Sequence, residues 1–186
     1  MLINEIITES IVDEYRLHDR YDPTSHLARG DQLKNRYKPV KTPLTQFNVR
    51  YDDAGKYHDY YLYDKKTGRC VGLFTLEPKK VATFQFRNLL KPGVEVVTPH
   101  MALGPEAQRQ GISTLAYSTF LRGGPWVFMT DEHTKGASKL WDSLVGGDMI
   151  SFYASRKTDS MVTTPPSPED VRFLGPKDRF NLAQQA

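Results

Sequence analysis

The spacing of apolar residues divides the chain into a helical beginning, a run of strands and an alternating helix–strand end. Within residues 2–17, three isoleucines and Tyr15 recur every four residues with acidic residues between them, which predicts an amphipathic helix. Residues 18–45 are polar and interrupted by prolines. Two placements stay open for them: a short helix between loops, or an arm that wraps the domain.

Short strands are expected in the next part of the chain. Alternating or continuous apolar runs predict them at 46–51, 59–63, 70–76, 81–86 and 94–103. Residues 64–68 read Asp-Lys-Lys-Thr-Gly, which is a good hairpin connection between the second strand and the third. Pro99 interrupts the last strand, and a proline inside a strand usually marks a bulge or a lost ladder bond.

Helices and strands alternate after this point. The apolar positions predict amphipathic helices at 112–121 and 137–145, and buried strands at 126–129 and 149–153. The end of the chain contains three prolines between 165 and 168, which favours an extended or mobile tail.

This order predicts an α/β or α+β fold with a mixed, mostly antiparallel central sheet flanked by helices and preceded by an N-terminal helical extension. The predicted organisation is an extension at 1–45, a central domain at 46–157 and a tail at 158–186.

The composition is that of a globular protein. Of 186 residues, 39% are hydrophobic and 25% charged, and no run approaches the ~18 apolar residues of a membrane span. The net charge of +3 comes from scattered basic residues balanced by acids, so a nucleic-acid partner is the least favoured kind. Cys70 is the only cysteine, the five histidines lack zinc-ligand spacing, and no metal is expected. The chain start does not resemble a secretory signal, which favours the cytoplasm.

The segment from Leu103 to Ser113 is the strongest candidate for chemistry, because it joins a predicted strand to a predicted helix. Gly111 lets the backbone approach a ligand, and the unpaired N–H groups of the first helical turn favour an anion such as a diphosphate. Arg109 adds a positive charge. The segment lacks the Gly-Lys-Ser/Thr of a Walker A loop and the three glycines of a dinucleotide fingerprint. Taken alone, it is equally well an ordinary strand-to-helix loop.

Gln108-x-x-Gly111-x-Ser113 resembles the acyl-CoA pyrophosphate loop of the GNAT N-acyltransferase superfamily, Gln/Arg-x-x-Gly-x-Gly/Ala. Leu103-Gly104-Pro105 matches the apolar-x-Pro that commonly precedes it, and the resemblance covers residues 58–153 in order. It implies a GNAT-like fold with acetyl-CoA or another acyl-CoA as co-substrate, and an amine-bearing acceptor of unknown class. Thr130-Asp131 followed by Leu140-Trp141 is similar to acyltransferase-like proteins of tailed phages, which would place the chain in a host cytoplasm.

The resemblance also implies roles for particular residues. It assigns the base to Glu95 or His100, and Tyr153 is the replacement candidate for the acid that protonates the CoA thiolate. The residues implied to bind the cofactor are Met101, Ala102, Leu103, Gln108, Arg109, Gln110, Gly111, Ile112, Ser113 and Thr114.

Three positions depart from the family pattern. Ser113 replaces Gly or Ala, Trp141 stands where the family often has its acidic tyrosine, and Gly146-Gly147 replaces Gly-Phe. Two functions therefore stay open: an N-acyltransferase, most simply an acetyltransferase, and a non-catalytic GNAT-like module. The module would be a phage accessory or virion protein that binds a protein partner through residues 2–17.

Overall fold

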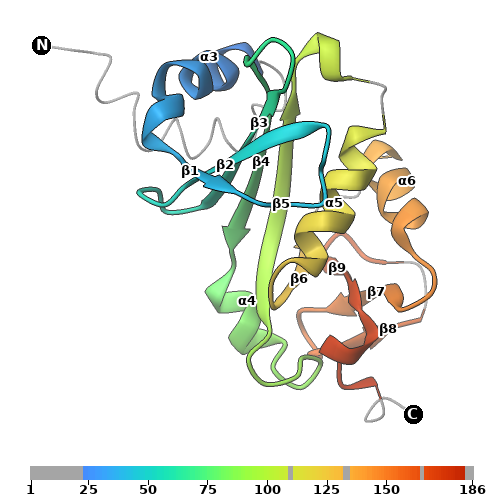
Figure 1. The fold of residues 1–186 in the computed structure, drawn as a ribbon. Coiled ribbons are helices and arrows are strands. Elements are labelled where there is room, and N and C mark those ends of the chain that lie inside the picture. Colours follow the sequence, from blue (N-terminus) through green and yellow to red (C-terminus); the bar gives the residue numbers. More distant parts are fainter. Residues whose placement is uncertain (1–22, 109–110, 132–134, 164–165, 183–186) are drawn as a thin grey trace, which may run out of the picture. The chain divides into compact units, whose positions relative to one another are not determined.

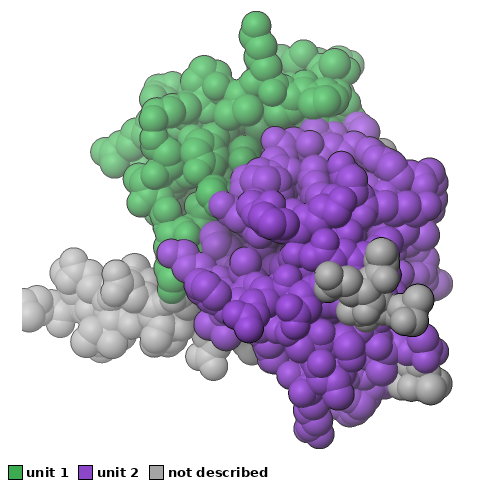
Figure 2. Space-filling view, turned by 90° about the horizontal axis from the view of Figure 1, so that it is seen from below, with its two compact units in different colours: residues 1–75, 100–110 green, residues 76–99, 111–186 purple. Residues whose placement is uncertain are grey.

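The computed structural model describes residues 23–108, 111–131, 135–163 and 166–182 (Figure 1). The chain forms two compact units, drawn in separate colours in Figure 2. Unit 1 comprises residues 1–75 and 100–110, and unit 2 comprises residues 76–99 and 111–186. The helix predicted at 2–17 lies outside the described residues. None of the described helices is both long and apolar enough to cross a membrane.

Unit 1 combines a helix with an antiparallel arrangement of strands. Its strands follow the order β1-β2-β3-β4-β5, and the β1–β2 and β2–β3 pairs are antiparallel. Its elements are α3 (Pro23–Leu33), η1 (Lys34–Arg36), β1 (Lys38–Val40), β2 (Phe47–Asp52), β3 (His58–Asp64), residues 70–75 of β4 (Cys70–Pro78), residues 100–103 of β5 (Glu95–Leu103) and η2 (Pro105–Ala107).

The predicted hairpin at 64–68 is present between β3 and β4. The Asp64 carboxylate accepts hydrogen bonds from the N–H groups of Lys66 (2.9 Å) and Thr67 (2.7 Å), and Gly68 adopts the left-handed conformation (φ 69°). These bonds, that of Thr67 above all, hold the pKa of Asp64 below its usual value. The strands predicted at 59–63 and 70–76 are observed as β3 and β4.

Helix α3 packs closely against the sheet of unit 1. The Tyr63 hydroxyl donates to the Gly30 carbonyl oxygen at 2.7 Å. Tyr37, which follows η1, stacks its ring on that of Tyr61 with the centroids 4.5 Å apart. A Cβ on Gly30 would lie 2.6 Å from the Cys70 sulfur, so glycine allows this close approach. Of the stretch left unplaced in the sequence, residues 23–45 therefore supply a packed helix and an edge strand.

Unit 2 contains a parallel strand pair, formed by β5 and β6. Its strands follow the order β5-β6-β9-β7-β8; β5 and β6 are parallel, and the β6–β9, β9–β7 and β7–β8 pairs are antiparallel. Its remaining elements are α4 (Lys80–Gln85), α5 (Ile112–Arg122), β6 (Trp126–Thr130), α6 (Lys135–Leu144), β7 (Met149–Ser155), β8 (Ser160–Val162), β9 (Asp170–Pro176) and η3 (Lys177–Arg179). Helix α5 connects β5 to β6, as a parallel pair requires. The predicted fold class, a mixed and mostly antiparallel sheet flanked by helices, is confirmed.

Residues 80–85 are helical, so the strand predicted at 81–86 is wrong. Lys80–Gln85 forms α4, in which Ala82 is buried while Val81 and Phe84 are exposed; Phe86, which directly follows the helix, is also buried. The two buried residues are four positions apart, which suits one face of a helical turn. In so short a segment, the same residues also fit an alternating strand.

The end of the chain joins the sheet, which corrects the prediction of an extended or mobile tail. Strand β9 lies between β6 and β7, and all seven of its residues are buried. Phe173 meets Phe86, Phe152 and Phe180 in the core of unit 2. A strand with neighbours on both sides and both faces covered shows no alternation, so its pattern carried little signal. The predicted boundaries after residues 45 and 157 stay a prediction.

The close approach of α3 to the sheet predicts that Gly30→Ala destabilises the protein. We expect the free energy of unfolding in urea to fall by about 1–3 kcal/mol, because the new methyl group overlaps Cys70 and Tyr61. Gly55→Ala is the matched control, since its nearest atoms would lie at 3.6 Å, and we expect a change within about 0.5 kcal/mol. Alanine favours helix by about 1 kcal/mol over glycine, so a rise in stability at position 30 would contradict this packing.

Candidate functional site

Strand β5 changes its pairing near Pro99. In unit 2, its partner pairs with β6 run from Glu95↔Trp126 to Val97↔Phe128. Strand β6 continues to Thr130, where its partner is β9. Pro99 has no N–H to donate to a ladder. Pairing of β5 with β6 therefore ends before the proline, in agreement with the interruption predicted from the sequence.

The second part of β5 lies in unit 1 and leads into the candidate loop. His100, Met101, Ala102 and Leu103 are half-buried. The Gly104 N–H donates to the Val71 carbonyl oxygen at 2.9 Å, which ties the end of the strand to β4. The Gln108 side-chain amide donates to the Leu103 carbonyl oxygen at 3.1 Å. Gln108 therefore closes the turn around η2.

Helix α5 begins in unit 2 directly after Gly111. Gly111 has φ 69° and ψ 7°, a left-handed conformation that favours glycine, and a Cβ there would meet no atom within 4 Å. No side chain caps the helix start, and the first turn contains no acidic residue. Ile112 is buried, Ser113 half-buried and Thr114 exposed. The N-terminus of α5 thus presents unpaired backbone N–H groups beside open space, which suits an anion.

The two ends of α5 differ in their hydrogen bonding. At the C-terminal end, the Trp126 indole donates to the Phe120 carbonyl oxygen at 2.8 Å and the Arg179 guanidinium to the Leu121 carbonyl oxygen at 2.7 Å. Side-chain donors from the protein therefore satisfy carbonyl groups at the C-terminal end, whereas no side chain caps the N-terminal end. Arg109 and Gln110, which the resemblance assigns to the cofactor, lie outside the described residues.

Glu95 lies at the opposite end of α5 from Gly111. It is exposed, pairs with Trp126, and its N–H donates to the Pro125 carbonyl oxygen at 2.8 Å. Pro125 follows α5 by three residues, and an 11-residue helix is about 16 Å long. The structure therefore does not bring Glu95 to the start of α5.

Tyr153 and Trp141 meet at a shared neighbour, Arg172. The Arg172 guanidinium lies 5.6 Å from the centre of the Tyr153 ring and 5.8 Å from that of Trp141. Tyr153, on β7, is half-buried and pairs with Arg172 of β9. Trp141, on α6, is only 3% exposed. The rings of Trp141 and Tyr153 thus share one cationic neighbour.

Arg172 is a residue that the sequence interpretation missed. It is 7% exposed, and its guanidinium donates to the Ser151 hydroxyl at 2.7 Å and to the Asp142 carboxylate at 2.5 Å. The Ser151 hydroxyl in turn donates to the Phe173 carbonyl oxygen at 2.8 Å. The sequence signal for Arg172 was an arginine inside the apolar run 171–174. A charged residue in a buried strand needs hydrogen-bonded or charged partners, so this arginine indicated a polar cluster in the interior.

Cys70 is a buried, free cysteine in unit 1. Burial raises the pKa of the Cys70 thiol to about 12, so the thiol stays protonated and unreactive at neutral pH. Within the described ranges, no three His, Cys, Asp or Glu side chains are grouped so that they would hold a metal ion.

No protein-family model matches the sequence, and no curated protein is similar to it. Solved structures share part of the arrangement. An acetyltransferase of Bacillus subtilis in complex with CoA is 10% identical and has a TM-score of 0.40, over 65% of this chain and 77% of that chain. Arabidopsis thaliana NAA60 in complex with a bisubstrate analogue is 13% identical with a TM-score of 0.37, over 84% and 94%.

A GNAT-family acetyltransferase of Streptococcus pneumoniae is 8% identical with a TM-score of 0.33, over 64% of this chain and 66% of that chain. All three TM-scores lie below 0.5 and all identities below 25%, so these similarities do not assign the chain to a family.

Proposed function

We propose that the protein is an acyl-CoA-dependent N-acyltransferase, most simply an acetyltransferase that acts on an amine. The observation that carries this proposal is the start of α5: a left-handed Gly111 with open space beside it and an uncapped first turn that lacks acidic residues. This start follows the loop whose sequence resembles the GNAT pyrophosphate motif.

The CoA diphosphate would bind the backbone N–H groups of the first turn of α5. A helix N-terminus stabilises an anion by about 0.3–1 kcal/mol per charge at an exposed site. Several N–H donors converge there, and Gly111 adds no side chain that would exclude the phosphates. The Ser113 and Thr114 hydroxyls and the Arg109 guanidinium are further donors in this proposal. Gln108 acts indirectly, because its amide holds the turn at Leu103.

The pantetheine arm would run along the backbone of Met101, Ala102 and Leu103, the strand residues that precede the loop. Pairing between β5 and β6 ends before Pro99. The backbone N–H and C=O groups of the strand residues after the proline would therefore hydrogen-bond to the amide groups of the pantetheine arm, as an added strand does.

In the reaction, the acceptor nitrogen would attack the thioester carbon. A C–N bond forms, the C–S bond breaks, a base takes a proton from the nitrogen, and an acid gives one to the thiolate. His100 is the proposed base, since Glu95 lies at the far end of α5. Tyr153 is the proposed acid, because Trp141 has no proton of useful acidity. The Arg172 guanidinium lies 5.6 Å from the centre of the Tyr153 ring.

A second function is favoured by one observation. Trp141, at the position of the usual acid, is buried against Arg172 and serves packing. A GNAT-like module that binds acyl-CoA or a partner without turnover would tolerate this residue. The proposed docking helix at 2–17 lies outside the described residues, and the tailed-phage origin stays a prediction.

Calorimetric titration with acetyl-CoA tests the binding site. We expect binding by the wild type, and a loss of at least about tenfold in affinity for Gly111→Trp, because an indole would occupy the phosphate position. Gly93→Trp is the matched control: Gly93 has φ 82° and open space, like Gly111, but lies in the turn before β5. The Gly93→Trp substitution imposes the same kind of backbone strain, and this variant should bind acetyl-CoA as the wild type does. Equal affinity in all three proteins, or no binding at millimolar acetyl-CoA, would refute the proposal.

Thiol release from acetyl-CoA over a panel of amines tests the acid. We expect Tyr153→Phe to lower kcat by roughly 10²–10⁴-fold while the Kd for acetyl-CoA changes less than about twofold. Tyr51→Phe, which removes another half-buried strand hydroxyl, should leave kcat unchanged. Cys70 does not interfere with the thiol assay, because its thiol is buried. An unchanged kcat for Tyr153→Phe would remove Tyr153 from the chemical step, and binding without turnover on every amine would favour the module.

A further inference from the structure

Unit 1 contains a cationic pocket of about 630 Å³, which is in the size range of small-molecule sites. The pocket is built from η1, β1, the connection from β1 to β2, β2 itself and Lys65 of the hairpin after β3. Four of its lining residues are basic and none is acidic; the basic ones are Lys34, Lys41, Arg50 and Lys65.

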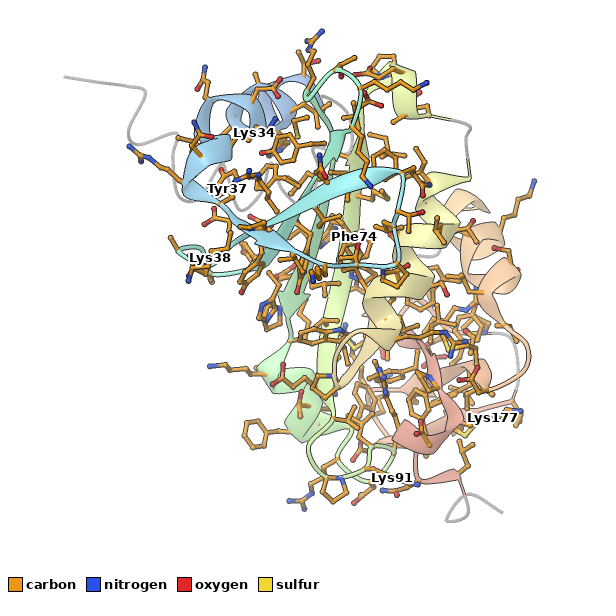
Figure 3. All side chains as sticks on the ribbon, in the orientation of Figure 1. Lys34, Tyr37, Lys38, Phe74, Lys91 and Lys177 are labelled. Atoms are coloured by element: carbon orange, nitrogen blue, oxygen red, sulfur yellow. The ribbon has the colours of Figure 1, made fainter. Side chains whose placement is uncertain are left out.

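Two of these cations are held in place by backbone carbonyl groups. The Arg50 guanidinium donates through one terminal nitrogen to the carbonyl oxygens of Lys34 (3.0 Å) and Tyr37 (3.1 Å). Lys34 donates to the Gly68 carbonyl oxygen at 2.5 Å and lies over the Tyr63 ring; Figure 3 labels Lys34 and Tyr37 just below α3. A guanidinium has five N–H donors, so Arg50 keeps a planar edge available in a fixed orientation.

The other two cations are exposed. No ion pair joins Lys41 or Lys65 to an acidic side chain within the described part of the chain. The nearby acids are engaged elsewhere: Asp64 accepts from the hairpin, Asp31 from the Cys70 N–H, and Asp53 pairs with Lys38. The positive charge of the pocket is therefore not neutralised by its own lining.

The rest of the lining is partly apolar. Leu44 and Val49 are buried and Phe47 is half-buried, while Thr42, Thr45 and Asn48 add uncharged polar groups. A pocket with a cationic rim and an apolar floor fits an organic anion better than a bare inorganic one. Arg50 and Lys34, which are held in place, and the exposed Lys41 and Lys65 together match a doubly charged group such as a phosphate.

We propose that this pocket binds a small molecule that carries a phosphate ester, with the phosphate held by Arg50, Lys34, Lys41 and Lys65. The site is separate in sequence from the proposed acyl-CoA loop and does not depend on it. A nucleic acid strand is the less favoured ligand, because the net charge of the whole chain is only +3.

Binding of inorganic pyrophosphate, measured by calorimetry in the Gly111→Trp background, tests this proposal. That background removes the proposed diphosphate contact at α5, so the two proposals fail separately. We expect Lys41→Gln/Lys65→Gln to weaken pyrophosphate binding about tenfold or more, because two charge-assisted contacts are lost. Lys66→Gln is the matched control: Lys66 is exposed, adjacent to Lys65 and absent from the lining, and its loss should change the Kd less than about twofold.

Both lysines are exposed, so circular dichroism and thermal melting should show that the double variant folds as the wild type does. Pyrophosphate binding that is insensitive to Lys41→Gln/Lys65→Gln, or that requires Gly111, would overturn the proposal. A single-stranded oligonucleotide serves as the competing ligand. If it binds more than about tenfold tighter than pyrophosphate, with a steep salt dependence and the same sensitivity to the variants, the pocket binds nucleic acid and the small-molecule proposal is overturned.

Discussion

Helix α5 starts from a left-handed glycine, and the proposed chemistry depends on that start. Gly111 has no side chain, a Cβ there would meet no atom within 4 Å, and no side chain caps the first turn of the helix. The rest of the helix cannot shift easily: Ala116, Tyr117, Phe120 and Leu121 are buried, and the Tyr117 ring meets Phe128 of β6 edge-on at 5.7 Å. Donors that are fixed before a ligand arrives cost little to organise when it binds.

The last strand of the chain supplies the second constraint on unit 2. Strand β9 completes the sheet between β6 and β7 and carries Arg172 into the interior. Its guanidinium links Asp142 of α6, Ser151 of β7 and the rings of Trp141 and Tyr153. Removing one partner from a buried, hydrogen-bonded charge is costly, so Arg172 fixes the arrangement of these residues as well as the environment of Tyr153.

The sequence predicted the elements that have local signals and missed those set by distant partners. The Asp64–Gly68 turn and the helix predicted at 112–121 are encoded within a few residues, and both are observed. Residues 81–86 contain too few positions to separate a helical period from an alternating one. Strand β9 is buried on both sides and has no period to detect. The cationic pocket gathers residues as far apart as Lys34 and Lys65, which meet only through strand pairing. Likewise, the sequence placed Glu95 on a strand but did not show which end of α5 lies near it.

The claim that the α5 N-terminus binds the CoA diphosphate is tested most directly by the backbone amides themselves. Amide signals of the ¹⁵N-labelled protein can be followed by NMR during titration with CoA. We expect the largest shifts and the strongest gain in protection from hydrogen exchange at Ile112, Ser113 and Thr114, because their N–H groups would donate to the phosphates. Saturation with CoA that leaves these three amides unchanged, while amides elsewhere shift, would contradict it.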